Sequence, residues 1–369
     1  MPETKYIWQS PKWPQFTWND SKILPLLSQA RKRQGALLAR ASELGLDLQV
    51  QILTDEAQKT SAIEGEKLEA ASLRSSIAKR LGIPNAGIPS KDRNIQGLIE
   101  MLIDATQNFK NPLTDIRIKG WQAGLFPTGY SGIHQIVTGS WRTSNEPMQV
   151  VSGQMGKAKV HYEAPPATQL KKEMTSFIKW FNSKQKIDGL IRAAVAHFWF
   201  VTIHPFDDGN GRIARAISDL ALAQDEDIAK RCYSLSSQIS HDRNAYYKIL
   251  ETSQKGSVEI TDWIIWFLET YTKALSSSEA IVEKTLLINS FWKIHAQTDL
   301  NPRQKKVLQK ILEFEPDGFQ GGMTNMKYVS INRVSSATAK RDLRDLEEKG
   351  ILKRNDQKGR SLSYSLKRK

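Results

Sequence analysis

The chain has 369 residues, of which 40% are hydrophobic, and a formal net charge of +14. No run of eighteen apolar residues is present and the polar N-terminus lacks a signal-peptide core, which argues against a membrane-spanning protein and favours the cytoplasm. The only cysteine, Cys232, excludes an intrachain disulfide and a cysteine metal cluster, and we expect a buried thiol.

The first third of the chain, residues 1–115, predicts an arm followed by helices. Residues 1–20 place three tryptophans among prolines, which is typical of an extended segment whose indoles pack on the body of the protein. From about Lys22 to Met101 the pattern is mostly helical, with breaks around Gly82–Pro89.

Residues 148–163 predict a β-hairpin. Two short β-prone runs flank a turn that contains glycine, and Pro165 and Pro166 end the second run.

Two helices with a turn between them follow. The apolar run from Leu190 to Ile203 reads as a buried helix with Asp188 as its N-cap. Pro205 disfavours helical geometry at the residue before it, so this helix should end near His204. A second helix should run from about residue 210 to about residue 224.

The turn, residues 204–215, concentrates groups that suit phosphate chemistry. A helix that begins among glycines offers free N–H groups to an anion. Arg212 and Arg215 lie one helical turn apart, and their guanidinium groups match phosphate oxygens. Asp208 is a hard oxygen ligand suited to Mg²⁺. His204 is a candidate general base because an unperturbed imidazole has a pKa of about 6.5.

Two other kinds of phosphate site were weighed. The sequence lacks a Walker-type string, which argues against a P-loop enzyme. His197, His204 and Asp208 could bind a transition metal, as in a phosphohydrolase. However, Pro205 breaks the helix between His197 and the turn, so we expect His197 to be a buried structural residue.

The string from His204 to Arg215 matches H-x-F-x-[DE]-G-N-G-R-x-x-R at every fixed position. The chain therefore resembles the Fic (Fic/Doc) family. The resemblance implies a mostly α fold, with a helical core over residues 116–275 and a small β-hairpin called the flap. It also implies an enzyme, a protein adenylyltransferase that moves AMP from ATP to a Ser, Thr or Tyr hydroxyl of a target protein.

The same resemblance implies a role for each residue of the motif. His204 would take the proton from the attacking hydroxyl, and Asp208 would hold Mg²⁺ on the phosphates of ATP. The phosphates would contact an anion-binding segment and two arginines, namely Gly209, Asn210, Gly211, Arg212 and Arg215.

Residues 60–65 resemble [ST]-x-x-x-E-[GN], the inhibitory pattern of one branch of the family. Glu64 would pair with Arg215 and keep that arginine from the γ-phosphate. The residues alone also permit a solvated Glu64 followed by a glycine C-cap. In some relatives this glutamate supports removal of AMP, so the chain is a candidate for both reactions.

In the family, the flap binds the target segment as an added strand. The target would be bound by Val150, Val151, Val160, His161 and Tyr162. An ordinary surface hairpin is the alternative. A homodimer is an expectation from family habit alone.

The C-terminal part is basic and resembles a winged helix-turn-helix domain. Residues 301–369 hold 17 Lys and Arg against 8 Asp and Glu, and the pattern reads helix, helix, helix, hairpin. A capping box at Ser276–Glu279 predicts that a connecting helix, within residues 276–300, begins there. DNA contacts are expected at Ser336, Thr338, Lys340, Arg341, Arg344, Lys358 and Arg360.

Two functions from different classes remain open at this stage. The first is an adenylyltransferase inhibited by Glu64. The second is a DNA-binding regulator whose core has become a nucleotide sensor, although the intact His204 favours the enzyme because a sensor needs no base there.

Overall fold

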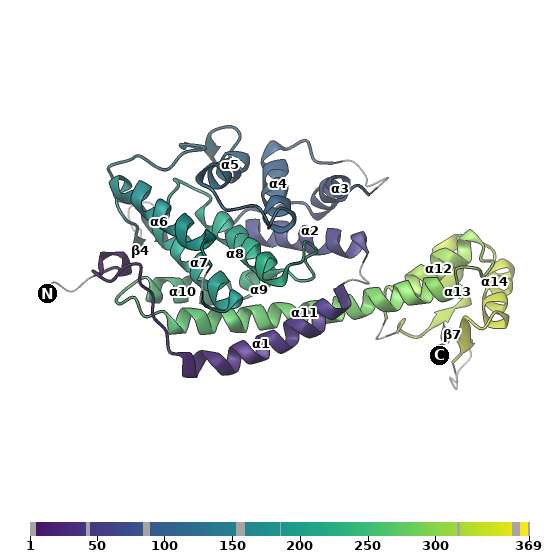
Figure 1. Cartoon of the computed structure of the whole chain (residues 1–369). Coiled ribbons are helices and arrows are strands. Elements are labelled where there is room, and N and C mark those ends of the chain that lie inside the picture. Colours follow the sequence, from purple (N-terminus) through teal and green to yellow (C-terminus); the bar gives the residue numbers. More distant parts are fainter. Residues whose placement is uncertain are drawn as a thin grey trace. The chain divides into compact units, whose positions relative to one another are not determined.

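Apolar residues at helical spacing run through most of the chain, and the computed structural model is mostly helical with small antiparallel strand pairs, as predicted. The structure describes residues 5–41, 45–83, 89–152, 159–184, 186–315, 318–355 and 362–367. The chain divides into two compact units, residues 1–282 and 283–369 (Figure 1). None of the described helices is both long and apolar enough to cross a bilayer.

The first unit contains eleven of the described helices, the last of which continues into the second unit. They are α1 (Asp20–Ala41), α2 (Leu46–Ile63), α3 (Ala70–Arg80), α4 (Arg93–Gln107), α5 (Asp115–Leu125), α6 (Leu170–Asn182), α7 (Gly189–Ile203), α8 (Asn210–Glu226), α9 (Leu235–His241), α10 (Arg243–Ser253) and α11 (Thr261–Ile294). The strands of this unit form two hairpins, β1 (Tyr130–Ser131) with β2 (His134–Gln135), and β3 (Gln149–Ser152) with β4 (Lys159–Glu163). Residues 7–9 and 167–169 form short 3₁₀ helices.

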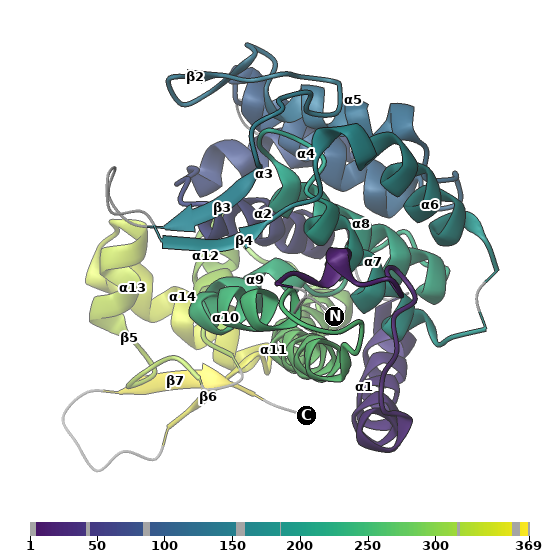
Figure 2. The ribbon, with the colours of Figure 1, turned by 90° about the vertical axis from the view of Figure 1, so that its left-hand side faces the viewer.

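Helices α7 and α8 form the centre of this unit. Every residue of α7 from Leu190 to Ile203 except Arg192 is buried, which matches its apolar sequence. Both views place α7 and α8 between α4 and α5 on one side and α10 and α11 on the other (Figures 1 and 2). The Trp263 indole of α11 donates to the Ala194 carbonyl of α7 at 2.8 Å. The segment that joins α7 to α8 is therefore held by a rigid core.

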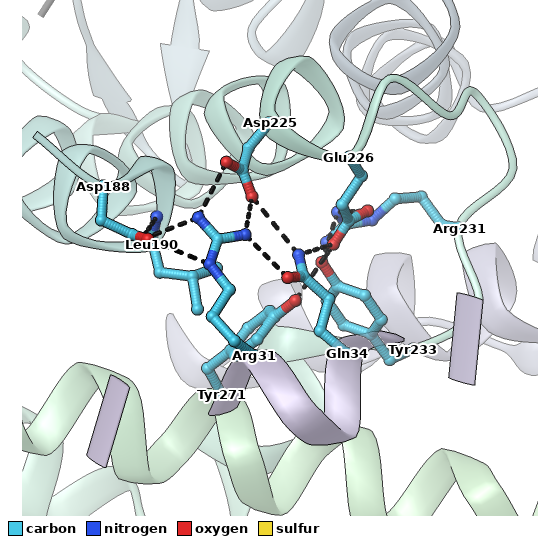
Figure 3. A network of polar contacts seen from close by, with 9 residues as sticks. All are labelled: Arg31, Gln34, Asp188, Leu190, Asp225, Glu226, Arg231, Tyr233 and Tyr271. Carbon is cyan, nitrogen blue, oxygen red and sulfur yellow. Dashed lines mark hydrogen bonds and ion pairs between the residues drawn. The ribbon is translucent and has the colours of Figure 1, made fainter. Parts of the chain in front are cut away.

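A polar network fixes the far ends of the same two helices (Figure 3). Arg31 of α1 forms ion pairs with Asp188, the N-cap of α7, and with Asp225 near the end of α8. Next to it, buried Arg231 pairs with Glu226, whose carboxylate also accepts from the Tyr233 and Tyr271 hydroxyls. Arg31 thereby links the N-terminus of α7 to the C-terminal end of α8.

The N-terminal arm packs on the body largely as predicted. The Trp8 indole donates to the Glu163 carbonyl at 2.8 Å, and the Trp13 indole to the Glu173 carboxylate at 2.9 Å. The Trp18 indole instead donates locally to Asp20. Cys232 is a buried free thiol, as expected, and burial raises its pKa to about 11.

The predicted helix start at Ser276 is wrong. Helix α11 runs without a break from Thr261 to Ile294, and the Ser276 hydroxyl donates to the Thr272 carbonyl one turn earlier. A serine inside a helix commonly bonds back in this way, so the capping pattern Ser-x-x-Glu has no cap to form here.

The second unit has a hydrophobic core of its own. After the end of α11 it contains α12 (Pro302–Leu312), β5 (Met323–Thr324), α13 (Asn325–Asn332), α14 (Ser336–Glu348), β6 (Leu352–Arg354) and β7 (Ser363–Leu366). The strands form an antiparallel sheet in the order β5-β7-β6. The sequence predicted the helices and the final hairpin but not β5, whose two residues are too few to give a strand pattern.

Candidate active site

The turn between α7 and α8 has an unusual backbone. His204 ends α7 with a left-handed conformation, at φ 50°, and Gly209 precedes α8 with φ 90°. A histidine in this region is uncommon, whereas glycine adopts it at little cost. Both helix boundaries lie where the sequence predicted them. The turn therefore places His204 at the end of α7 and the first N–H groups of α8 at the two ends of one six-residue segment.

His204 carries a neutral imidazole. Its Nδ1 lies 3.1 Å from the Val201 carbonyl, which is satisfied when Nδ1 carries the proton and leaves Nε2 as an acceptor. Burial lowers the pKa of His204 to about 4, and the nearby Arg142 cation acts in the same direction. The Val201 carbonyl, Glu64 and Asp208 oppose that shift. The imidazole is therefore unprotonated at neutral pH.

The side chain of Asn210 braces the turn. Its amide accepts from the Phe206 N–H at 3.0 Å and donates to the Phe206 carbonyl at 2.8 Å, and it is buried. The Phe206 ring is also buried and lies 4.9 Å from the Trp141 ring. This structural use of the Asn210 amide adds to the phosphate contact that the resemblance implies.

Asp208 lies at the same turn, with one carboxylate oxygen accepting from the Gly209 N–H at 2.6 Å and the other from the Ser131 hydroxyl. A single carboxylate suits Mg²⁺, which takes its remaining ligands from phosphates and water. Among the described residues, no group of three or more His, Cys, Asp and Glu could hold a metal by itself.

His197 is structural, as the sequence predicted. It is fully buried, and its ring nitrogens lie 2.8 Å from the Ser218 hydroxyl and 2.9 Å from the Tyr246 hydroxyl. Burial lowers its pKa to about 3, with a further contribution from Arg215. Both nitrogens are in use, so the phosphohydrolase alternative loses one of its ligands.

Glu64 contacts Arg215, the pairing that the resemblance implies. Glu64 follows the last residue of α2, and its Oε1 accepts from Arg215 Nη2 at 2.8 Å. Arg215 also donates to the Thr60 hydroxyl and carbonyl at 2.7 and 2.9 Å. A side chain at Gly211 would place Cβ 2.2 Å from Glu64 Oε1, so only glycine allows this approach.

A second glutamate, which sequence reasoning missed, contacts the other arginine. Both carboxylate oxygens of Glu66 accept from Arg212 Nη1, at 3.1 and 3.0 Å. Arg212 is buried, while Glu66 is 48% exposed. Their pair lines a cavity of about 350 Å³ together with Phe126, Tyr130 and Ser131. Both arginines of the motif are thus bound by carboxylates from one short segment.

The predicted flap residues all lie on the hairpin of β3 and β4, but they differ in how far they are exposed to solvent. Val151 and Val160 are exposed, and Val150 is partly buried. Tyr162 is buried and its hydroxyl donates to the Thr202 carbonyl of α7 at 2.7 Å, so its side chain anchors the hairpin. His161 lies 2.6 Å from the Glu251 carboxylate. Along the described strands, β3 and β4 pair only with each other, and on β4 the Glu163 carbonyl already accepts from the Trp8 indole.

The predicted DNA contacts differ in how far they are already engaged. Ser336 donates to Asn325 at 2.8 Å, the Thr338 hydroxyl bonds to Ser335, and Arg344 pairs with Glu348. Lys340 and Arg341 are exposed on α14 without an ion pair to any described residue. Lys358 and Arg360 lie outside the described residues.

Comparisons with known proteins agree with the sequence motif. The model of the Fic/DOC family matches residues 112–222, and a model of a domain of unknown function (DUF4172) matches residues 6–83. The relatives called protein adenylyltransferase Fic from Aedes aegypti and Nematostella vectensis are 27% and 26% identical over 252 and 204 residues. These alignments cover 63% and 54% of this chain but only 46% and 43% of the relatives, so the chain spans less than half the length of either.

The fold also has a solved counterpart. The crystal structure of a Fic family protein from Desulfovibrio desulfuricans G20 is similar over 94% of this chain and 95% of that chain, with a TM-score of 0.57 at 16% identity. The likeness at this identity concerns the fold, and it agrees with the family match over residues 112–222, which includes the turn between α7 and α8. The chain therefore contains a Fic/DOC family domain.

Proposed function

We propose that this chain is a protein adenylyltransferase that transfers AMP from ATP to a hydroxyl of a target protein. One observation carries the proposal: a neutral imidazole, a carboxylate and the N-terminus of α8 lie within the seven residues 204–210, and the first two turns of α8 add the buried arginines Arg212 and Arg215. The names of the relatives from Aedes aegypti and Nematostella vectensis support it.

The chemistry assigned to the turn uses few groups. His204 Nε2 accepts the proton of the target hydroxyl as its oxygen forms a bond to the α-phosphorus and pyrophosphate leaves. The N–H groups at the start of α8, together with Arg212 and Arg215, bind and neutralise the phosphates. Asp208 is the residue that would hold Mg²⁺, which supplies further neutralisation of phosphate charge when bound.

Mass spectrometry of the target-free protein tests the reaction type. After Glu64→Gly protein is exposed to ATP and Mg²⁺, a mass increase equal to one AMP on a Ser, Thr or Tyr side chain supports the proposal. An increase equal to one phosphate instead would identify a kinase and contradict it. Protein treated with ATP and a chelator is the control.

We further propose that Glu64 inhibits AMP transfer, which its pairing with Arg215 supports. Glu66 adds to this inhibition by binding Arg212. Glu64→Gly then prepares an active form, and the same glutamate is a candidate for assisting removal of AMP.

The effect of Glu66 should be smaller than that of Glu64, because Glu66 is half exposed and an exposed ion pair contributes about 0.2–1 kcal/mol. In the Glu64→Gly background, Glu66→Gln should lower the apparent Kd for ATP roughly two- to fivefold, as measured by calorimetry with a non-hydrolysable analogue. Glu69→Gln is the matched control, because among the described residues this carboxylate bonds to the nearby Ser72 hydroxyl and to neither arginine. An unchanged Kd in the Glu66→Gln variant would argue against this role.

A second role is proposed for residues 301–369, namely binding to duplex DNA as a winged helix-turn-helix. The presence of three helices with the antiparallel sheet β5-β7-β6, and the exposed cations Lys340 and Arg341 on α14, favour it. A DNA-binding regulator with a nucleotide-sensing core would share this property with an enzyme, so DNA binding does not by itself choose between the two.

Arg341→Ala should weaken binding to duplex DNA and reduce the slope of log K against log salt by about one, because each phosphate contact releases condensed counterions. Fluorescence anisotropy with a labelled duplex over a salt series measures both quantities. Lys310→Ala removes an equal charge from α12, where Lys310 pairs with Glu313, and should leave the slope unchanged. Equal slopes in wild type and Arg341→Ala would contradict the assignment.

A further inference from the structure

Arg142 joins the motif turn to the base of the flap. It is 3% exposed, and its Nε donates to the His204 carbonyl at 2.8 Å. Its Nη2 donates to the Pro165 carbonyl, two residues beyond the end of β4. Its backbone N–H donates to the Pro205 carbonyl at 3.0 Å. One buried side chain and its amide thus hold three carbonyls from two segments.

Two of these bonds lie where the backbone needs support. The left-handed conformation is unfavourable for an ordinary residue, and it persists only where the surroundings fix it. His204 has that conformation, and Arg142 donates hydrogen bonds to the carbonyls of His204 and Pro205. These bonds therefore restrain the backbone that carries the imidazole.

The third bond places the flap against the same point. Ala164 continues the hairpin by donating to the Met148 carbonyl at 2.9 Å, and the next residue is Pro165. Tyr162 fixes the same end of β4 to the last turn of α7. Through Arg142, the end of the flap hairpin at Pro165 is thus anchored directly to His204.

We propose that Arg142 is a positioning residue that couples the flap to His204, so that a target strand bound on the hairpin presents its hydroxyl at a fixed distance from the imidazole. This inference rests on the proposed adenylyl transfer. Its physical basis is that a misplacement of about 1 Å between reacting groups can cost about 100-fold in rate.

The proposal predicts separate effects on kcat and on nucleotide binding. In the Glu64→Gly background, Arg142→Ala should lower kcat for label transfer from ATP roughly 100-fold, while the Kd for a non-hydrolysable ATP analogue stays within about twofold, since Arg142 is not assigned to the phosphates. Arg142→Lys can keep one of the two side-chain bonds, so its kcat should lie between those of the Glu64→Gly parent and the Arg142→Ala variant. A loss of nucleotide binding equal to the loss of kcat would overturn the assignment.

Arg117 offers a matched control. It too is a well-shielded arginine that donates to several carbonyls, those of Asp104, Asn108 and Asn111, but it lies on α5 away from the turn. Arg117→Ala should lower stability without lowering kcat for the folded protein. An equal fall in kcat in both variants would mean that Arg142 acts only through stability.

Hydrogen exchange tests the coupling without any need for activity. In Arg142→Ala, or in Arg142→Lys if the first variant does not fold, exchange should rise together at residues 204–206 and at residues 160–164. Unchanged exchange at either segment would overturn the coupling. Should Glu64→Gly protein transfer no label at all, the adenylyl-transfer proposal fails, and the exchange result still decides whether Arg142 joins the two segments.

Discussion

Glu64→Gly should raise the rate of AMP transfer roughly 10- to 100-fold over the wild-type chain. The carboxylate accepts from a guanidinium that is 2% exposed, and hydrogen bonds between charged groups contribute about 1.5–3 kcal/mol. Each 1.36 kcal/mol corresponds to about a tenfold change in rate, which gives the expected range. Incorporation of label from ATP labelled at the α-phosphate measures it.

A control variant separates the inhibitory contact from a general change in charge. Glu69→Gln alters a nearby carboxylate that contacts neither arginine, and should leave the rate at the wild-type level. A Glu64→Gly protein no faster than wild type would mean that Arg215 is not what limits the reaction.

His204→Ala in the Glu64→Gly background should lower the rate by about 10²–10⁴-fold, the usual contribution of a general base. Burial lowers the pKa of His204 to about 4, so the imidazole is neutral above that value. The rate of the Glu64→Gly protein should therefore be nearly constant from pH 6 to 8 and should fall only at about pH 4 or below, because Glu64, which raises this pKa, is absent. Initial rates of label transfer over this pH range measure both effects.

The matching histidine control lies in the second unit. His295→Ala removes an imidazole just after the end of α11 and should leave the rate unchanged. Retention of full activity in His204→Ala would exclude the imidazole as the base and would require another group at the turn to take the proton.

Much of the site was predictable because it is local in sequence. Pro205 and the apolar run before it placed the end of α7. Asp188 was predicted as the N-cap of that helix, and its carboxylate accepts from the Leu190 N–H at 2.8 Å. The pairing of Glu64 with Arg215 joins residues far apart in sequence, and the resemblance to the family, rather than any pattern of spacing, led to it.

The residues that were missed make contacts that have no sequence signature. Arg142 binds backbone carbonyls, which every residue carries, so nothing in its neighbourhood marks it as a partner of His204. Glu66 becomes informative only when the segment after α2 is placed beside Arg212. Likewise, the pattern at Ser276 is compatible with a cap or with the middle of a helix, and the packing of α11 decides between them.

The central claim is that the turn between α7 and α8 acts on the α-phosphate of ATP. Parallel incubations of the Glu64→Gly protein with ATP labelled at the α-phosphate and with ATP labelled at the γ-phosphate test it most directly. We predict that the α-label is retained on protein and that the γ-label is not, with both signals absent in the additional His204→Ala variant. Retention of the γ-label, or of neither label, would contradict the claim.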